Sequence, residues 1–307
     1  MEKKYHGVIP PIITPILPDE TVDEEGFKQL IDYCIGGGLQ GIFVCGSNGE
    51  CMALTQKERN HAIKVAVDQI GDRVPLMVGV MDTSTQRVID NVKAAEDLGA
   101  KCAVVTPVFY DRHTSQDETV RHMEAILQNS NIDLMLYNIP LFTGQKLTGK
   151  TMIEVAKLDK RVVGLKDTGG DFAQFATALE ELRDDPDFSV LQGNTALGMV
   201  SLGMGADGYV PAMSTAFPKM FAMSYEEGKS GDPAVIKKYN ALVRETSKIL
   251  GMSKNGTAAA KYAISLRGFT SKQVIRPQDV TTPEDEAKIK AKMAEIDEKL
   301  KDLGLFY

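Results

Sequence analysis

Short apolar runs rich in β-branched residues alternate along the chain with longer amphipathic segments. Eight runs span residues 8–14, 41–45, 76–80, 102–106, 134–137, 162–165, 189–191 and 208–210. Between them, apolar residues recur at intervals of three and four, the period of a helix with one buried face. These segments span residues 24–34, 56–69, 86–98, 119–127, 149–157 and 172–182. The pattern predicts an α/β fold.

The predicted strands are continuously apolar, which is typical of parallel strands covered on both faces. Such a sheet either closes into a barrel or stays open and doubly wound. A doubly wound nucleotide site needs GxGxxG directly after the first strand, whereas Thr14-Pro15-Ile16 follows it here. Eight runs favour closure, so we predict a (β/α)8 TIM barrel.

Three further helical patterns follow the eighth run, near residues 233–250, 257–266 and 282–303. No low-complexity tract separates them from the rest of the chain. We therefore predict a barrel over residues 1–230 and a C-terminal helical appendage over residues 231–307, packed together as one structural unit.

Composition and charge exclude several classes of protein. Apolar residues make up 43% of the chain, so we expect a sizeable core, and the net charge of −7 without a basic stripe argues against a nucleic-acid partner. Prolines interrupt the first apolar run, so we expect no export signal or membrane span. The four cysteines lack CxxC spacing and a nearby histidine, which indicates a reducing cytoplasm rather than a catalytic thiol.

The histidines do not favour a metal site, which would need ligands converging on the strand ends. His61 and His122 lie in helical patterns, His6 precedes the first strand, and only His113 falls in a strand-end loop. We therefore predict neither a metal nor another cofactor.

Reactive side chains of a barrel enzyme lie at the carboxyl ends of its strands, and Lys166 is the only lysine at such a position. Burial would lower its pKa from about 10.4 toward about 7–8, where a neutral amine attacks a carbonyl. The alternative is a lysine paired with Asp167 or with another strand-end acid. Tyr137 ends the adjacent strand and could pass a proton to a carbinolamine, or it is only a packed tyrosine.

Gly-Ser-Asn-Gly-Glu at 46–50 could fold tightly and offer N–H groups and the Ser47 hydroxyl to a carboxylate, or form an ordinary glycine turn. A phosphate could instead bind within residues 193–208, as after late strands of other barrels, but this stretch contains no basic residue.

Four fragments together resemble the dihydrodipicolinate synthase and N-acetylneuraminate lyase family. They are Gly-Ser-Asn-Gly-Glu at 46–50, Thr-Pro at 106–107, Tyr-Asn-Ile-Pro at 137–140 and Gly-Leu-Lys-Asp-Thr at 164–168, in the family's order and spacing. The resemblance implies a class I lyase in which Lys166 forms an imine with pyruvate or another 2-oxo acid. Tyr137 would carry the proton, linked by Ser47 to Tyr110 in a hydroxyl relay. Tyr110 would come across a subunit interface, as in homotetramers built from dimers.

The same resemblance assigns residues to the substrate. Gly46, Ser47 and Asn48 would hold the carboxylate of the 2-oxo acid, with Thr168 and Gly193 near the substrate. Asn48 departs from the family's usual threonine, although its amide can still donate to a carboxylate.

Two further departures bear on the aldehyde partner. Phe142 stands where synthases carry the arginine that binds a second carboxylate, and an apolar ring cannot replace that pair. Sialic-acid lyases have an acidic pair shortly after the glycine matching Gly193, whereas Asn194 and Thr195 follow here. We therefore expect a 2-keto-3-deoxy sugar acid, or a substrate with an apolar tail against Phe142. The alternatives are the synthase activity, the sialic-acid lyase activity, or a non-catalytic protein that binds 2-oxo acids.

Overall fold

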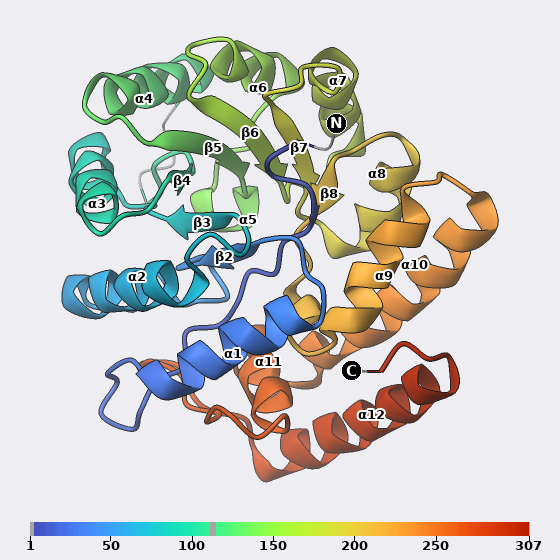
Figure 1. Ribbon diagram of the computed structural model, residues 1–307. Coiled ribbons are helices and arrows are strands. Elements are labelled where there is room, and N and C mark those ends of the chain that lie inside the picture. Colours follow the sequence, from blue (N-terminus) through green and yellow to red (C-terminus); the bar gives the residue numbers. More distant parts are fainter. Residues whose placement is uncertain (1–2, 111–114, 307) are drawn as a thin grey trace.

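Eight parallel strands form a ring enclosed by helices in the computed structural model, which describes residues 3–110 and 115–306 (Figure 1). The strands are β1 (Gly7–Val8), β2 (Ile42–Val44), β3 (Leu76–Gly79), β4 (Cys102–Val105), β5 (Asp133–Asn138), β6 (Val162–Asp167), β7 (Ser189–Gln192) and β8 (Gly208–Tyr209). They are paired in the order β1-β8-β7-β6-β5-β4-β3-β2, and a parallel bridge between Pro11 and Phe43 closes the ring. The predicted (β/α)8 barrel is confirmed.

Strand β1 is shorter than the run predicted from the sequence because two prolines follow it. Pro10 and Pro11 have no backbone N–H and cannot donate to a strand ladder. The chain nevertheless continues alongside β2, since the Ile12 N–H donates to the Phe43 carbonyl at 3.0 Å and the Phe43 N–H donates to the Pro10 carbonyl at 2.9 Å. Backbone hydrogen bonds therefore join the first and second strand segments beyond the ends of β1.

The helices follow the strands in alternation. They are α1 (Glu24–Gly36), α2 (Gln56–Ile70), α3 (Thr85–Asp97), α4 (Gln116–Gln128), α5 (Pro140–Thr143), α6 (Gly149–Ala156), α7 (Phe172–Leu182), α8 (Gly198–Gly203), α9 (Pro218–Gly228), α10 (Pro233–Ser247), α11 (Gly256–Ser265) and α12 (Pro283–Asp302). In α1, Asp23 caps the N-terminus by accepting the Gly26 N–H, and Phe27, Leu30 and Ile31 form a buried stripe at helical spacing.

Two barrel helices were not predicted from the sequence. Helix α8 has only six residues, too few to show a helical period. Helix α9 buries residues around most of its circumference, so its apolar and polar positions do not alternate clearly. The helices that follow β7 and β8 therefore became evident only in the folded chain.

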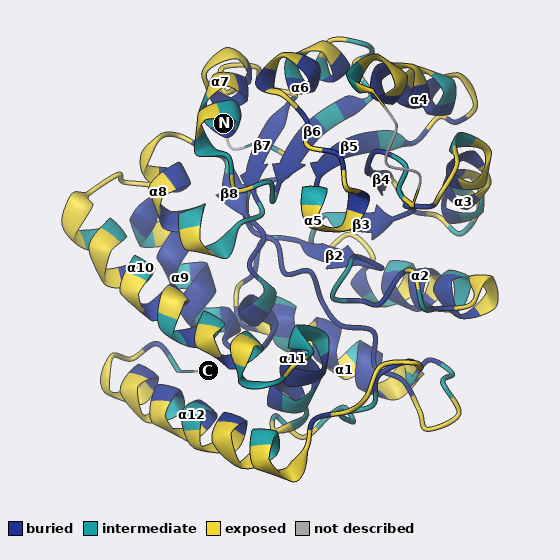
Figure 2. Cartoon of the chain, turned by 180° about the vertical axis from the view of Figure 1, so that it is seen from behind, coloured by how far each residue is buried: buried dark blue, intermediate teal, exposed yellow. Residues whose placement is uncertain are grey.

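The core has two layers, one inside the barrel and one between strands and helices. Residues at alternate strand positions, such as Cys102 and Val104 on β4 and Met135 and Tyr137 on β5, share the inner cluster. Figure 2 shows the strands almost entirely buried, while the helices are exposed mainly on their outer faces. The side chains that point inward are therefore surrounded by protein on all sides except at the ends of the barrel.

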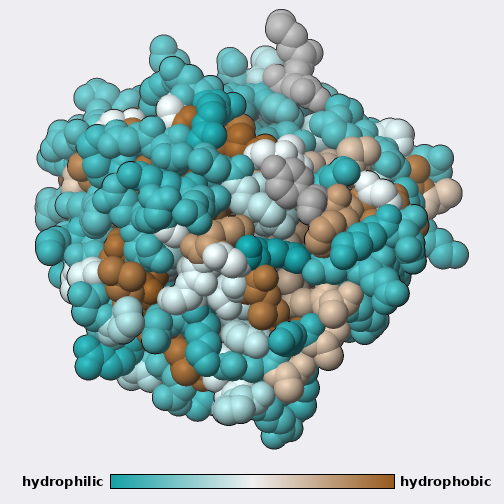
Figure 3. Space-filling view, turned by 60° about the horizontal axis from the view of Figure 1, so that its bottom comes forward, coloured by the Kyte–Doolittle hydropathy of each residue, from teal (hydrophilic) through white to brown (hydrophobic). Residues whose placement is uncertain are grey.

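Helices α10, α11 and α12 follow the last barrel helix and lie together at one side of the barrel, beside α1 and α9 (Figure 1). In the face shown in Figure 3, apolar side chains form separate groups among hydrophilic ones. None of the described helices is long and apolar enough to cross a membrane. The division of the chain at residue 230 falls between α9 and α10 and stays a prediction.

Candidate active site

Strands β5 and β6 bring the two principal predicted residues side by side. In the parallel register Tyr137 is paired with Lys166, and Asn138 with Asp167. Side chains paired in register point to the same face of a sheet, and both Tyr137 and Phe43 belong to the cluster inside the barrel. The Lys166 Nζ lies 3.9 Å from the centroid of the Tyr137 ring and 4.5 Å from that of the Phe43 ring. The lysine therefore points into the barrel.

Lys166 is not engaged by an acid. Its side chain is buried, and across residues 3–110 and 115–306 no carboxylate forms an ion pair with it. Asp167 instead accepts hydrogen bonds from the Asn138 side-chain amide and the Gly169 N–H, both at 2.7 Å. The alternative of a Lys166–Asp167 pair is therefore wrong, because successive strand residues point to opposite faces.

Burial lowers the pKa of Lys166 to about 7, and the Cys51 thiol opposes this shift. Removing an ammonium from water disfavours its charged form, and no carboxylate of the described residues forms an ion pair that would compensate the loss of hydration. A substantial fraction of the amine is therefore neutral at neutral pH. A neutral amine carries the lone pair that nucleophilic attack on a carbonyl requires.

Tyr137 is buried beside this amine, and its burial raises the pKa of the phenol above the ordinary value. The hydroxyls of Thr168 and Ser47 oppose that rise. The Thr168 hydroxyl has no hydrogen bond of regular geometry within the described residues. The phenol therefore stays protonated at neutral pH and has a proton to give.

The loop at residues 46–50 follows β2, and its Ser47 reaches Tyr137. An added Cβ at Gly46 would lie 2.8 Å from the Phe43 ring, so a larger residue there would displace this ring. The Gly49 carbonyl accepts a hydrogen bond from the Thr14 hydroxyl at 2.8 Å, and the Asn48 amide donates to the Pro11 carbonyl at 3.4 Å. The residues after the first two strands are thereby held against each other at the carboxyl end of the barrel.

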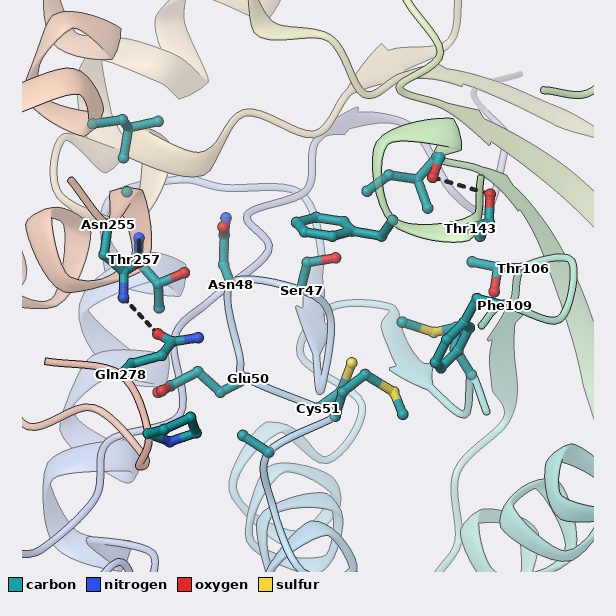
Figure 4. A pocket seen from close by; sticks show the side chains of 18 of the residues that line it. Ser47, Asn48, Glu50, Cys51, Thr106, Phe109, Thr143, Asn255, Thr257 and Gln278 are labelled. Carbon is teal, nitrogen blue, oxygen red and sulfur yellow. Dashed lines mark hydrogen bonds between the residues drawn. The ribbon is translucent and has the colours of Figure 1, made fainter. Parts of the chain in front are cut away.

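A cavity of about 800 Å³ opens above this loop (Figure 4). Its walls come from the loops after β2 to β5 and from the C-terminal region. The lining residues are Ser47, Asn48, Glu50, Cys51, Met52, Ala53, Met81, Thr106, Phe109, Ile139, Phe142, Thr143, Leu250, Asn255, Gly256, Thr257, Arg276, Pro277 and Gln278. Lys166 and Tyr137 are not in this lining, but Ser47 both lines the cavity and contacts Tyr137. The buried pair therefore lies next to the cavity, at Ser47.

Of the other predicted site residues, two line the cavity, one is packed against Thr168 and one is exposed outside the cavity. Asn48 and Phe142 line the cavity, with Phe142 largely exposed. Gly193 packs beneath Thr168, where an added Cβ would lie 2.0 Å from the Thr168 hydroxyl oxygen. Tyr110 is 94% exposed, has a positive φ of 77° and does not line the cavity of its own chain. Its predicted action across a subunit interface stays a prediction.

The sequence did not indicate that the C-terminal region helps to form the cavity. Asn255, Thr257 and Gln278 lie opposite the barrel loops, and the Asn255 side-chain amide donates to the Gln278 side-chain carbonyl at 2.6 Å (Figure 4). Asn255 also caps α11 by accepting the Thr257 N–H. Its capping position could have been read from the sequence, whereas its place in the cavity wall depends on how the C-terminal region packs.

Metal-binding and thiol chemistry find little support among the described residues. No group of three or more histidine, cysteine or acidic side chains in that part of the chain could hold a metal ion, and His113 lies outside it. All four cysteines are free and buried, and burial raises the pKa of Cys51, which lines the cavity, to about 11. A thiolate is therefore scarce at neutral pH.

Comparison with known proteins gives matches over nearly the whole chain. The model of the dihydrodipicolinate synthetase family matches residues 4–297. A 4-hydroxy-tetrahydrodipicolinate synthase of Methanoculleus marisnigri is 30% identical over 286 residues, covering 92% of this chain and 96% of the relative. One of Salinibacter ruber is 32% identical over 237 residues, covering 77% of this chain and 78% of the relative.

Solved structures agree with these matches. The dihydrodipicolinate synthase of Bacteroides thetaiotaomicron superposes with a TM-score of 0.90 at 29% identity, covering 96% of this chain and all of that one (100%). YagE, a prophage protein of the dihydrodipicolinic acid synthase family from E. coli K12 solved in complex with pyruvate, gives a TM-score of 0.89 at 27% identity, covering 95% of this chain and 98% of its own.

Proposed function

Since this chain belongs to the dihydrodipicolinate synthetase family, whose members are lyases, we propose that it forms an imine between Lys166 and pyruvate or another 2-oxo acid. The observation that carries the proposal is the buried amine of Lys166, with a pKa lowered to about 7 and no acid paired with it within the described residues. An amine in this state is a nucleophile rather than a structural cation.

The proposed reaction begins with attack of the Lys166 nitrogen on the C2 carbonyl carbon. The carbonyl oxygen takes up a proton to give a carbinolamine, which loses water to leave the imine. Tyr137 is in position to give the proton and take it back, since its phenol stays protonated beside the amine. The imine then accepts the electron pair released when a carbon–carbon bond breaks, or supplies an enamine when one forms.

We propose that the loop at residues 46–50 holds the carboxylate of the 2-oxo acid. Ser47 and Asn48 both line the cavity, and Ser47 also reaches Tyr137. Hydroxyl, amide and backbone N–H groups can donate to a carboxylate without a cation. Thr168 and Gly193 pack against each other directly after β6 and β7, the first of which carries Lys166. This supports their predicted place close to the substrate.

For the second substrate we propose a hydroxylated chain, as in a 2-keto-3-deoxy sugar acid. Arg276 is the one basic residue in the cavity lining of the described structure, and Glu20 already accepts from its Nε at 2.7 Å. Thr257 and Gln278 offer uncharged polar groups instead. Such a wall suits hydroxyls better than a second carboxylate, which favours a sugar acid over the substrate of the synthases named among the relatives.

Assembly and location are further parts of the proposal. Members of the family are typically oligomeric, and we propose a homotetramer made of dimers in which Tyr110 reaches a neighbouring site. Its exposure, with that of Leu141 and Phe142, supports burial of this face against a second copy. Free buried cysteines fit a reducing compartment such as the cytoplasm.

Borohydride reduction in the presence of pyruvate tests the imine directly. We expect the mass of Lys166 to increase by that of a reduced pyruvate adduct. Because only the neutral amine attacks, the initial rate of adduct formation should rise with pH up to the pKa of about 7 and level off above it. Peptide mass mapping at a series of pH values measures both.

Two results would contradict the proposal of an imine formed by a lysine of lowered pKa. One is bound pyruvate without any adduct at Lys166, which would leave the non-catalytic binding protein as the better description. The other is a rate that keeps rising toward pH 10, as for an ordinary solvated lysine.

A panel of aldehydes tests the second substrate. With pyruvate present, short hydroxyaldehydes should give turnover at least about tenfold faster than aspartate semialdehyde, because the latter brings a carboxylate to a wall without an unpaired cation. Product formation by mass spectrometry is the measurement. Faster turnover with aspartate semialdehyde would instead assign the synthase activity, and cleavage of N-acetylneuraminate the sialic-acid lyase activity.

A further inference from the structure

Lys261 on helix α11 is a second buried lysine, distinct from the one at the end of β6. Its side chain is 0% exposed, and its ammonium forms an ion pair with Glu50, whose side chain is 1% exposed. Ala258, Ala259 and Ala260 precede it in the helix and are also buried. The Lys261 ammonium therefore lies on the buried side of α11. Among the described residues its sole ion-pair partner is Glu50, in the loop at 46–50.

Glu50 connects that loop to the C-terminal region through two contacts, one for each carboxylate oxygen. One carboxylate oxygen faces Lys261, and the other accepts the Ile275 N–H at 2.8 Å. Its backbone has a φ of +55°, a left-handed conformation that is unfavourable for a residue with a side chain unless contacts hold it. The C-terminal contacts of Glu50 supply such a hold.

Stability alone is a weak reason for this pair. Burying a lysine and a glutamate removes the hydration of both, and apolar residues of similar size are often at least as stabilising. Burial lowers the pKa of Lys261 while Glu50 acts to raise it, so attraction only offsets part of the desolvation. What a directed ion pair does provide is a defined distance and orientation between α11 and the loop.

The Lys261–Glu50 ion pair is made close to Ser47 and Asn48 in the loop, so the orientation that it fixes affects these two residues. At Gly49 the loop is held by the Thr14 hydroxyl, and at Glu50 by α11 and Ile275. Both contacts are made directly after Ser47 and Asn48, and Glu50 itself also lines the cavity. A change at Lys261 would therefore move the loop without touching the substrate.

We propose that the Lys261–Glu50 ion pair is a positioning contact that holds the loop at 46–50 in its carboxylate-binding conformation, and so makes α11 part of the 2-oxo acid site. This rests on the proposed function of the loop. In this role Lys261 acts on binding of the 2-oxo acid, whereas Lys166 acts on the chemistry.

The test compares three variants of the full chain. Lys261→Met removes one charge, and Glu50→Gln with Lys261→Met removes both while keeping an oxygen for the Ile275 N–H. Asp297→Asn is the matched control, since it breaks the ion pair of Arg267 with α12 at 2.8 Å without contacting the loop. For each variant we measure the thermal unfolding temperature, KM for pyruvate, kcat, and hydrogen exchange of the amides in residues 46–51.

We expect Lys261→Met to raise KM for pyruvate by about 10- to 100-fold, the size of effect that a small displacement of binding groups produces, with a much smaller change in kcat. The double variant should recover thermal stability, because no buried charge is left unpaired, but should keep the raised KM. Exchange in residues 46–51 should be faster in both variants than in Asp297→Asn, whose KM should equal that of the unmodified chain.

The proposal is overturned if the double variant recovers KM together with stability, since the pair would then be structural only. An unchanged KM in Lys261→Met would overturn it as well. If the unmodified chain forms no pyruvate adduct, the proposed function fails instead. Hydrogen exchange then still decides whether the pair holds the loop, because that measurement needs no substrate.

Discussion

Replacing Lys166 with methionine should reduce turnover by at least about 10³-fold, the order of loss expected when a covalent nucleophile is removed. Methionine keeps a long side chain between the Phe43 and Tyr137 rings but has no amine to attack a carbonyl. The borohydride adduct with pyruvate should disappear at the same time. Steady-state kinetics and peptide mass mapping measure the two losses.

This loss should not reflect unfolding. The pKa of Lys166 is lower in the folded chain than in the unfolded chain, so the unfolded chain binds more protons between about pH 7 and about pH 10.4. Stability therefore rises with pH across that window, and burial of the amine is most costly below it. Lys166→Met should consequently unfold at the same temperature as the unmodified chain at pH 7, or at a higher one.

Lys64→Met is a suitable control, because this exposed lysine on α2 pairs with the exposed Asp68 and with no other acid of the described residues. It should retain the adduct and full turnover. A Lys166→Met variant that still forms a pyruvate adduct, or keeps more than about a hundredth of the turnover, would show that another amine carries the reaction.

Replacing Tyr137 with phenylalanine should lower kcat by about 10²- to 10⁴-fold, the range supplied by a positioned proton donor. The ring would remain beside the Lys166 amine and edge-on to Phe43, where the two ring centroids are 6.3 Å apart. Binding of pyruvate should therefore change much less than turnover. Stopped-flow measurement of adduct formation, combined with a pyruvate titration, separates the two effects.

Tyr209→Phe provides the matched control. Tyr209 is also a buried tyrosine on a barrel strand, but its hydroxyl is hydrogen-bonded to Ser224 and belongs to the outer core. Loss of the Tyr209 hydroxyl should change the stability of the folded chain and leave kcat unchanged. Equal turnover in Tyr137→Phe and in the unmodified chain would remove the phenol from the mechanism, and a parallel loss in Tyr209→Phe would indicate a general effect of core tyrosines.

The regular part of the fold could be predicted because its pattern is local. The buried stripe of α1 reflects the helical period of 3.6, and the continuous apolar runs reflect strands that are covered on both faces. Where local pattern and tertiary environment diverge, the prediction was incomplete. Helix α9 is buried on nearly all sides, and β1 ends early because Pro10 and Pro11 cannot donate hydrogen bonds.

For the candidate site, the sequence placed Lys166 and Tyr137 at the ends of adjacent strands, and parallel pairing makes such residues neighbours. The sequence could not choose between a free lysine and a lysine paired with Asp167. The alternation of side chains along β6 settles that choice, because it turns Asp167 toward Asn138 and Gly169 and leaves Lys166 inside the barrel. The roles assigned to the site residues stay predictions until the variants are measured.

The sequence by itself determined the eight strands, the helices that follow the first six of them, the barrel they form and the position of one lysine at a strand end, because each follows from spacing along the chain. Only the tertiary structure decided that this lysine has a lowered pKa, and that Lys261 and Glu50 form a buried ion pair beside the cavity. The physical reason is that desolvation and ion pairing depend on every group within a few ångströms, and those groups come from segments distant in sequence.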